Sequence, residues 1–396
     1  MNKQLTEEIV GSASRRGVLL SVLGTLLIVF LVNVAASLYL KNYTTNRGYW
    51  LIAKKWEMLF GLKRPVDWLI LGDSSCNQGV DPDILDKKLG VTSINLCTVG
   101  NMLAVNDVWM LNKYIQQFGA PRNVLIVHVY DIWSRDVNPY YLAKVPLDWG
   151  YWRQMEPPLN LSFKEMTHLF IGRYVPLYAD NLTLSELLKS PLMSIKKNSE
   201  YRLEENGFMI VSQPQPQLVK KALKASIEFH KQNKPKFSMS NRQALDRITA
   251  LAEKHSFDVY IANSPLYEEL YENKEFQAYN SQVQKTLNAY VAKSERVHNI
   301  LQEPMTFSID QMDNVDHLIY SAAPVYTNGI VAEIMSIQKG ARDEGRWEHP
   351  DYAKTQPHEQ GAHVAHPTKK EYFYKSGMHP GRSPYKVHSQ LSTAKF

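Results

Sequence analysis

The stretch from Trp68 to Leu85 reads WLILGDSSCNQGVDPDIL. A short apolar run ends in Gly-Asp-Ser-Ser-Cys, and the residues that follow predict a helix. A chain that leaves a buried strand in this way either makes a plain turn or places a nucleophilic serine at the end of the strand. Open parallel sheets bind their ligands beyond the carboxyl ends of their strands, so the second interpretation predicts a site at Ser74.

The sequence around this stretch alternates between strand and helix patterns. Apolar runs predict strands at residues 66–72, 92–97 and 122–131. Apolar residues at helical spacing predict helices at 81–90 and 101–119. This β-α-β-α-β order is typical of a parallel sheet covered by helices.

Between about residues 137 and 217 the alternation is interrupted by a segment rich in aromatic residues and proline. This insertion either lines a groove for carbohydrate or acyl chains or forms a satellite hydrophobic cluster under long loops. A helical piece is expected within it at 182–197. The alternation then resumes, with helices at 241–256, 275–294 and 323–338 and strands at 257–265 and 296–302. We therefore predict an α/β fold, a three-layer, doubly wound parallel sheet of about five strands, over residues 65–339.

The N-terminal region predicts a membrane anchor. Residues 17–40 form a run of 24 residues without a charge, and about 20 apolar residues are enough to span a bilayer. Arg15 and Arg16 favour a cytoplasmic tail over residues 1–16 and a main domain outside the cytoplasm, although Lys and Arg residues also follow the run. A cleaved signal is the alternative, but its apolar core is usually only about 7–15 residues long. The amphipathic connector at 41–64 either lies at the membrane interface or packs on the domain.

Composition excludes several classes of protein. The chain has 396 residues, of which 44% are hydrophobic, and this is enough for a large core. The net charge is +6, and ten Lys or Arg against six Asp or Glu lie in residues 339–396, so the rest is too weakly basic to predict nucleic-acid binding. Zinc-type cysteine spacing, a Walker loop and a GxGxxG motif are absent, so no metal or cofactor is predicted. Residues 340–396 are polar and rich in histidine, and we expect a disordered basic tail.

The chain contains two cysteines, Cys76 and Cys97. If the first two predicted strands are neighbours, both cysteines lie near strand ends at one edge of the sheet, where a disulfide can form. The alternative is a pair of small buried thiols. A disulfide would indicate an oxidising compartment.

A candidate base for Ser74 lies late in the chain. A serine is a weak nucleophile unless a base takes its proton, and a carboxylate usually orients that base. The segment DQMDNVDHLIYSAA at 310–323 contains His317 with Asp313 and Asp316 nearby. It lies between the last predicted strand and the last predicted helix, so it should reach the same edge of the sheet. Considered separately, Ser74 could be a helix N-cap and His317 a solvated loop residue, but together they predict a catalytic pair.

These motifs resemble the SGNH/GDSL hydrolase superfamily. LGDSSCNQGVDPDIL at 71–85, followed by INLCTVGNM at 94–102, is especially similar to its membrane-anchored bacterial branch. That branch resembles proteins that O-acetylate alginate and other exopolysaccharides or help to D-alanylate teichoic acids. The resemblance covers roughly residues 66–338 and implies an SGNH/flavodoxin-like fold.

The resemblance also implies roles for three residues. Ser74 matches the family's nucleophile, whose backbone amide is one oxyanion donor. Gly100 matches the second-block glycine, whose amide is another oxyanion donor. His317 matches the catalytic histidine in front of the last helix.

The chain departs from the family pattern in two places. The third block of the family supplies an asparagine to the oxyanion hole, whereas this chain reads HVYD at 128–131 and has Tyr130 at that position. Either the Tyr130 hydroxyl is the third oxyanion donor, or the third donor is absent. The family's aspartate stands three residues before the histidine, where this chain has Asn314. Asp313 and Asp316 are the alternatives, and we favour Asp313 because the adjacent Asp316 would have to turn back sharply. Because one lost oxyanion donor costs about 10²–10³ in turnover, the departures fit slow acyl transfer or a binding role better than efficient hydrolysis.

Two functions of different classes follow. The first is a membrane-tethered O-acyltransferase or esterase that forms an ester on Ser74 and acts on a polysaccharide in the periplasm or at the cell surface. A multi-span membrane acyltransferase would be its partner. The second is a catalytically inactive SGNH-like module that binds glycan or docks on such an acyltransferase.

Overall fold

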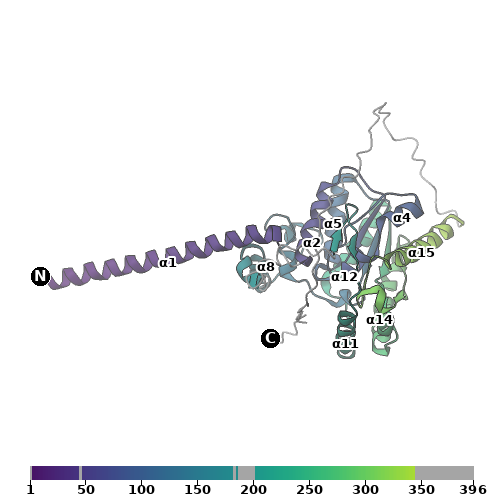
Figure 1. Ribbon diagram of the computed structural model, residues 1–396. Helices are drawn as coiled ribbons and strands as arrows, with labels where there is room; N and C mark the ends of the chain where they lie inside the picture. The colour runs from purple at the N-terminus through teal and green to yellow at the C-terminus, as the bar shows by residue number, and fades with distance from the viewer. Residues whose placement is uncertain (1, 44–46, 182–183, 186–200, 344–396) are drawn as a thin grey trace, which may run out of the picture. The chain divides into compact units, whose positions relative to one another are not determined.

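The structure is a computed structural model that describes residues 2–43, 47–181, 184–185 and 201–343 (Figure 1). Two sequence-based expectations fall wholly or mostly outside these ranges. They are the tail, from residue 344 onward, and most of the helical piece at 182–197.

A parallel sheet of five strands forms the centre of the fold, in the order β2-β1-β3-β6-β8. The strands are β1 (Trp68–Gly72), β2 (Ser93–Asn95), β3 (Asn123–His128), β6 (Asp258–Asn263) and β8 (Val297–Ile300). Every residue of β1 is buried, as expected for a strand covered on both faces. The predicted α/β class and number of strands are confirmed.

Helices cover both faces of this sheet (Figure 1). The long helices of the domain are α4 (Pro82–Leu89), α5 (Leu103–Phe118), α11 (Pro216–Gln232), α12 (Met239–His255), α14 (Lys274–Val291) and α15 (Ala323–Asp343). The α5 and α12 helices pack together, as do α4 and α15, and α14 packs against β8. Each predicted long helix of the domain is present, whereas α11 was not predicted.

The remaining elements complete the domain, and all of them are short except the helix Phe163–Tyr174, which has 12 residues and was not predicted. They are α3 (Ser74–Gly79), η1 (Gly100–Met102), η2 (Ile132–Ser134), α6 (Pro139–Leu142), α7 (Tyr151–Gln154), α8 (Phe163–Tyr174), α9 (Pro176–Ala179), β4 (Tyr201–Leu203), β5 (Met209–Val211), β7 (Leu266–Tyr267), α13 (Glu268–Tyr271), β9 (Thr306–Phe307), η3 (Ile309–Gln311), β10 (Met312–Asn314) and β11 (His317–Leu318). The described part of the insertion contains α6–α9 and the β4–β5 hairpin, and its buried Tyr151 and Trp152 belong to the main hydrophobic core. The insertion is therefore packed on the domain.

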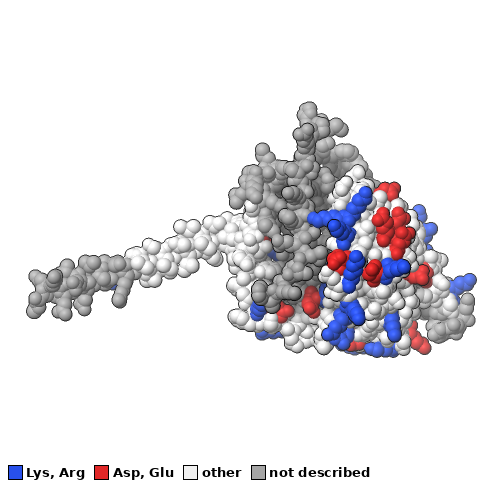
Figure 2. Space-filling view, turned by 90° about the horizontal axis from the view of Figure 1, so that it is seen from below, with Lys and Arg blue, Asp and Glu red and all other residues white. Residues whose placement is uncertain are grey.

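The first helix, α1 (Asn2–Tyr43), contains the candidate membrane span. Its segment Arg16–Leu40, 25 residues with a mean hydropathy of 2.6, is long and apolar enough to cross a membrane. In Figure 2 the described part of this helix is almost entirely white, whereas the visible face of the domain carries charges of both signs. These properties fit the predicted single-pass anchor.

The connector helix α2 (Arg47–Gly61) packs on the domain rather than lying separate from it. Its Ile52, Trp56 and Leu59 are buried in the main core, and the Trp56 indole donates to Asn106 Oδ1 at 3.1 Å. Of the two alternatives for the connector, the structure shows the packed helix.

A buried lysine on α2 ties this helix to the sheet. The Lys55 ammonium donates to the Asn95 carbonyl oxygen at 2.7 Å, to Asn95 Oδ1 at 3.2 Å, and to the Gly207 carbonyl oxygen. Asn95 ends β2, and Gly207 lies in the β4–β5 hairpin. Burial lowers the pKa of Lys55 well below its usual value. One side chain thus joins the connector, a strand end and the hairpin.

Candidate active site

The turn that carries Ser74 is held by its neighbours on both sides. Gly72 has φ +141°, and a Cβ on it would lie 2.0 Å from the Val127 carbonyl oxygen of β3, so only glycine fits there. Asp73 is the N-cap of α3, and its Oδ1 accepts from Ser75 N at 2.9 Å and Ser75 Oγ at 2.6 Å. Ser74 is therefore the first residue of the helix and not its cap.

Ser74 is also the accessible point of this segment. Every residue from Trp68 to Val80 is buried except Ser74, which is half-buried. A hydrophobic strand and a buried helix thus present one hydroxyl at the carboxyl end of β1. This position is where parallel sheets place their ligands.

Ser74, His317 and Asp316 form a hydrogen-bonded chain. Ser74 Oγ lies 2.8 Å from His317 Nε2, and His317 Nδ1 lies 2.5 Å from Asp316 Oδ1. With the proton on Nδ1, the imidazole donates to Asp316 and accepts from the Ser74 hydroxyl, which is the arrangement of a nucleophile, a base and an orienting carboxylate. The His317 and Asp316 side chains are 15% and 14% exposed, and Ser74 is half-buried, so solvent has partial access to this chain of bonds.

The carboxylate on His317 is that of Asp316 and not that of Asp313, which the sequence had favoured. In the β10–β11 hairpin, Asn314 stands opposite His317, and Asp316 lies in the tight turn between the strands. The turn bends the Asp316 side chain back onto the neighbouring ring. Asp313 Oδ1 instead accepts from Gln215 Nε2 at 2.8 Å.

Opposing effects set the pKa of His317. Burial by itself lowers this pKa, but the carboxylates of Asp316, Asp313 and Asp73 outweigh that effect and raise it to about 9. The imidazole consequently spends most of its time protonated at neutral pH, and its basic form becomes abundant only in alkaline solution.

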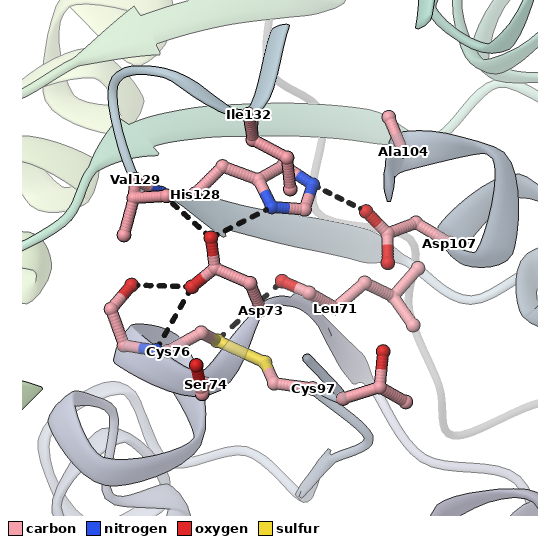
Figure 3. Close-up of polar contacts among 12 residues, drawn as sticks. Leu71, Asp73, Ser74, Cys76, Cys97, Ala104, Asp107, His128, Val129 and Ile132 are labelled. Atoms are coloured by element: carbon pink, nitrogen blue, oxygen red, sulfur yellow. Dashed lines mark hydrogen bonds and ion pairs between the residues drawn. A yellow bond between two sulfur atoms is a disulfide. The ribbon is translucent and has the colours of Figure 1, made fainter. Parts of the chain in front are cut away.

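A second aspartate–histidine network lies on the side of the turn that faces away from the Ser74 side chain (Figure 3). His128 Nε2 is 2.6 Å from Asp107 Oδ2, and His128 Nδ1 is 3.4 Å from Asp73 Oδ2, which also accepts from Val129 N at 2.8 Å. Burial lowers the pKa of His128, but the two carboxylates raise it to about 9. Burial alone raises the pKa of Asp73, yet the hydrogen bonds from His128, Ser75 and Val129 hold it well below its usual range. The network is therefore a buried cation between two anions.

Gly100 begins η1, five residues after the end of β2, as the resemblance implies for a glycine at this edge. Its surroundings include the Arg135 guanidinium, because a Cβ on Gly100 would lie 2.5 Å from Arg135 Nη1. Tyr130 follows β3, but its ring packs in an aromatic cluster, with ring centroids 4.7 Å from Phe276 and 5.1 Å from His230. Tyr130 thus belongs to a packed cluster of rings.

The two cysteines form a disulfide, Cys76–Cys97, the first of the two alternatives raised above (Figure 3). Strands β1 and β2 are neighbours, and this brings the two residues together. Cys76 lies two residues after Ser74, and Cys97 three residues before Gly100. The disulfide therefore joins the serine turn to the glycine loop.

Two residues of this region escaped the sequence analysis. Asp107 lies within α5, and nothing in its spacing connects it to His128. Arg135 forms an i,i+4 pair with Asp131, a pattern visible in DIWSR but common on protein surfaces. Within the described ranges, no group of three or more His, Cys, Asp or Glu side chains is arranged to hold a metal ion.

Comparison with known proteins adds little. No family model and no curated protein match the chain. A solved structure described as "The structure of a putative platelet activating factor from Streptococcus pneumonia" is similar at a TM-score of 0.34 and 11% identity. The similarity covers 76% of this chain and 98% of that chain. At this level of similarity, the fold assignment rests on the sheet topology described above.

Proposed function

We propose that this protein is a serine-dependent esterase or O-acyltransferase, anchored in a membrane, that acts on a polysaccharide outside the cytoplasm. The observation that carries the proposal is the chain of hydrogen bonds from Ser74 through His317 to Asp316 at the carboxyl end of β1. A plain turn has no need of a half-buried serine that is hydrogen-bonded to a histidine, which is itself hydrogen-bonded to a carboxylate.

The chemistry proceeds in two displacements. Ser74 Oγ attacks an ester carbonyl carbon, and its proton moves to His317 Nε2 while Asp316 stabilises the imidazolium. The carbonyl oxygen takes the electron pair of the broken π bond and becomes an oxyanion. When this intermediate collapses, the bond to the leaving alcohol breaks, and His317 returns the proton to that alcohol. Water or a sugar hydroxyl then attacks the Ser74 ester in the same way, giving hydrolysis or transfer.

The location and the substrate rest on other features. Disulfides persist in oxidising compartments, so Cys76–Cys97 supports a domain outside the cytoplasm. An apolar N-terminal helix with Arg15 and Arg16 before it supports a cytoplasmic N-terminus. A polysaccharide acceptor and a multi-span membrane acyltransferase as acyl supplier are what the sequence resemblance implies.

The test is labelling of the full chain, purified in detergent, with a serine-reactive fluorophosphonate probe. Wild type should label, whereas Ser74→Ala and His317→Ala should not. Ser75→Ala is the matched control, because its hydroxyl bonds to Asp73 and lies one residue from the nucleophile. It should retain labelling.

Two outcomes would contradict the proposal. A folded wild type that does not label would favour the catalytically inactive module that binds glycan or docks on a membrane protein. Labelling that survives in Ser74→Ala would place the reactive serine elsewhere. If labelling depends on Ser74, the protein is treated with p-nitrophenyl acetate and incubated with and without polysaccharide. This experiment distinguishes transfer of the acetyl group to a sugar hydroxyl from its hydrolysis by water.

A further inference from the structure

Arg135 places a permanent positive charge against the glycine loop. Its Nη1 lies so close to Gly100 that a Cβ added there would be 2.5 Å from Nη1 and 3.6 Å from Cζ. The space that a side chain at position 100 would fill is therefore occupied by the guanidinium. The conformation of Gly100 does not itself demand glycine, because its φ lies outside the left-handed region.

Asp131 orients this guanidinium. Arg135 Nη2 donates to Asp131 Oδ1 at 2.6 Å, and Nε donates to Oδ2 at 3.2 Å. This two-pronged pair uses one edge of the planar group and fixes its direction. Nη1, the nitrogen beside Gly100, lies at the other edge and carries two further N–H groups.

The charges around Ser74 act on Arg135. Burial lowers the pKa of Arg135, but Asp131, Asp73 and Asp316 together raise it above its usual value. Asp73 precedes Ser74 in the chain, and Asp316 orients its base. The guanidinium is consequently close enough to interact electrostatically with Asp73, next to the nucleophile, and with Asp316, next to the base.

Tyr130, which stands where the family has its third oxyanion donor, is part of an aromatic cluster. The Tyr130 ring is 5% exposed and packs against Phe276, His230 and Tyr279. Burial raises the pKa of its hydroxyl well above the usual value. Tyr130 thus builds the aromatic cluster between β3, α11 and α14, and the oxyanion requires a donor from another residue.

We propose that Arg135 is that donor, with Nη1 hydrogen-bonded to the oxyanion that forms when Ser74 attacks the carbonyl carbon. The inference rests on the proposed function and deepens it. Arg135 Nη1 joins the amides assigned to Ser74 and Gly100, and Gly100 lacks a side chain so that the guanidinium can approach. A charged donor makes a stronger hydrogen bond to an oxyanion than a neutral amide does. The site therefore replaces the family's asparagine with a cation from a different part of the loop after β3.

The experiment measures hydrolysis of p-nitrophenyl acetate by the full chain in detergent, with kcat and KM determined separately. Arg135→Ala should lower kcat by about 10²–10³ and change KM by less than about threefold, because the oxyanion exists only in the transition state. Arg135→Lys keeps the charge and should recover part of kcat. Arg296→Ala is the matched control, because Arg296 has the same 36% exposure and pairs with Asp258 at the opposite edge of the sheet. It should leave kcat unchanged.

A double-mutant cycle makes the test specific to the contact. Gly100→Ala should displace the guanidinium and lower kcat about tenfold or more in wild type. In the Arg135→Ala background the same change should cost less than about twofold. Independent losses at the two positions, or an Arg135→Ala effect confined to KM, would overturn the inference while leaving Ser74-dependent turnover intact. Absence of Ser74-dependent turnover in wild type would overturn the proposed function, and this inference with it.

Discussion

Two histidines lie on either side of the same turn, and each is bonded to aspartate, yet their surroundings differ. His128 is 1% exposed and has a carboxylate on each ring nitrogen. His317 is 15% exposed and has a carboxylate on one nitrogen and the Ser74 hydroxyl on the other. The comparison shows how one side chain becomes a structural cation or a candidate base. The second partner and the access to solvent decide which.

The largest effect is expected from a substitution in the Ser74–His317–Asp316 network. Asp316→Asn should lower the labelling rate constant of Ser74 by about 10³–10⁴, because the ring loses the carboxylate that fixes its tautomer and stabilises its charge. Asp313→Asn is the control and, measured above pH 9 where the basic form of His317 predominates, should change the rate by less than about threefold, because Asp313 bonds to Gln215 and not to His317. The measurement is the second-order rate constant with the fluorophosphonate probe. Equal losses in the two variants would restore Asp313 as the orienting residue.

A substitution in the buried Asp107–His128–Asp73 network should lower the stability of the fold and not the reactivity of Ser74. His128→Asn should lower the free energy of unfolding by about 3–5 kcal/mol, because it leaves two buried carboxylates without their cation. The folded pKa of His128 lies above its unfolded value of about 6.5, so its stabilisation is complete below that pH and is lost as pH rises through about 9. Urea unfolding at pH 6 and pH 10 should show the difference from wild type shrinking at the higher pH. His298→Asn, at a half-buried histidine on β8, is the control, and a cost as large there would contradict the prediction.

A smaller effect is expected from the disulfide, which borders both networks. Replacing Cys76 and Cys97 by serine should cost about 3 kcal/mol, because the unfolded chain regains the freedom of a closed loop with a sequence separation of 21. Thermal unfolding of the double variant, compared with reduced and oxidised wild type, measures this cost. Labelling should also slow, since the disulfide joins the turn of Ser74 to the loop of Gly100. Unchanged melting after verified reduction would show that packing alone holds the two segments.

The smallest effect concerns pH and sharpens the comparison. The pKa of His317 is raised to about 9, so its basic form is scarce at pH 7 and predominates only above pH 9. The labelling rate constant should rise about 50-fold between pH 7 and pH 9 and then level off. In Asp316→Asn the residual rate should reach its plateau at lower pH, because the main charge that raises this pKa is gone. A pH-independent rate in wild type would show that His317 is not the base.

The sequence pattern was enough to predict the strands of the central sheet and the long helices around it except α11, because β1 and β3 are continuous apolar runs and the apolar residues of α5 recur at helical spacing. It also predicted that Ser74 and His317 meet, because both follow strands at one edge of the sheet. The choice of Asp316 depends on the turn of a two-strand hairpin, which no spacing rule describes. The contacts of Asp107 with His128 and of Arg135 with Gly100 join elements that are distant in sequence, and only the packed fold reveals them.

The buried ammonium of Lys55 has a consequence for where the site can work. Through Asn95 and Gly207 it ties the connector helix α2 to the edge of the sheet. Four Cα-to-Cα steps separate the end of α1 from the start of α2, a span of at most about 14 Å. If α1 spans a membrane, the distance from Ser74 to the bilayer is therefore limited to roughly the dimensions of the domain. Any molecule that reacts at Ser74 would have to come within that distance of the bilayer.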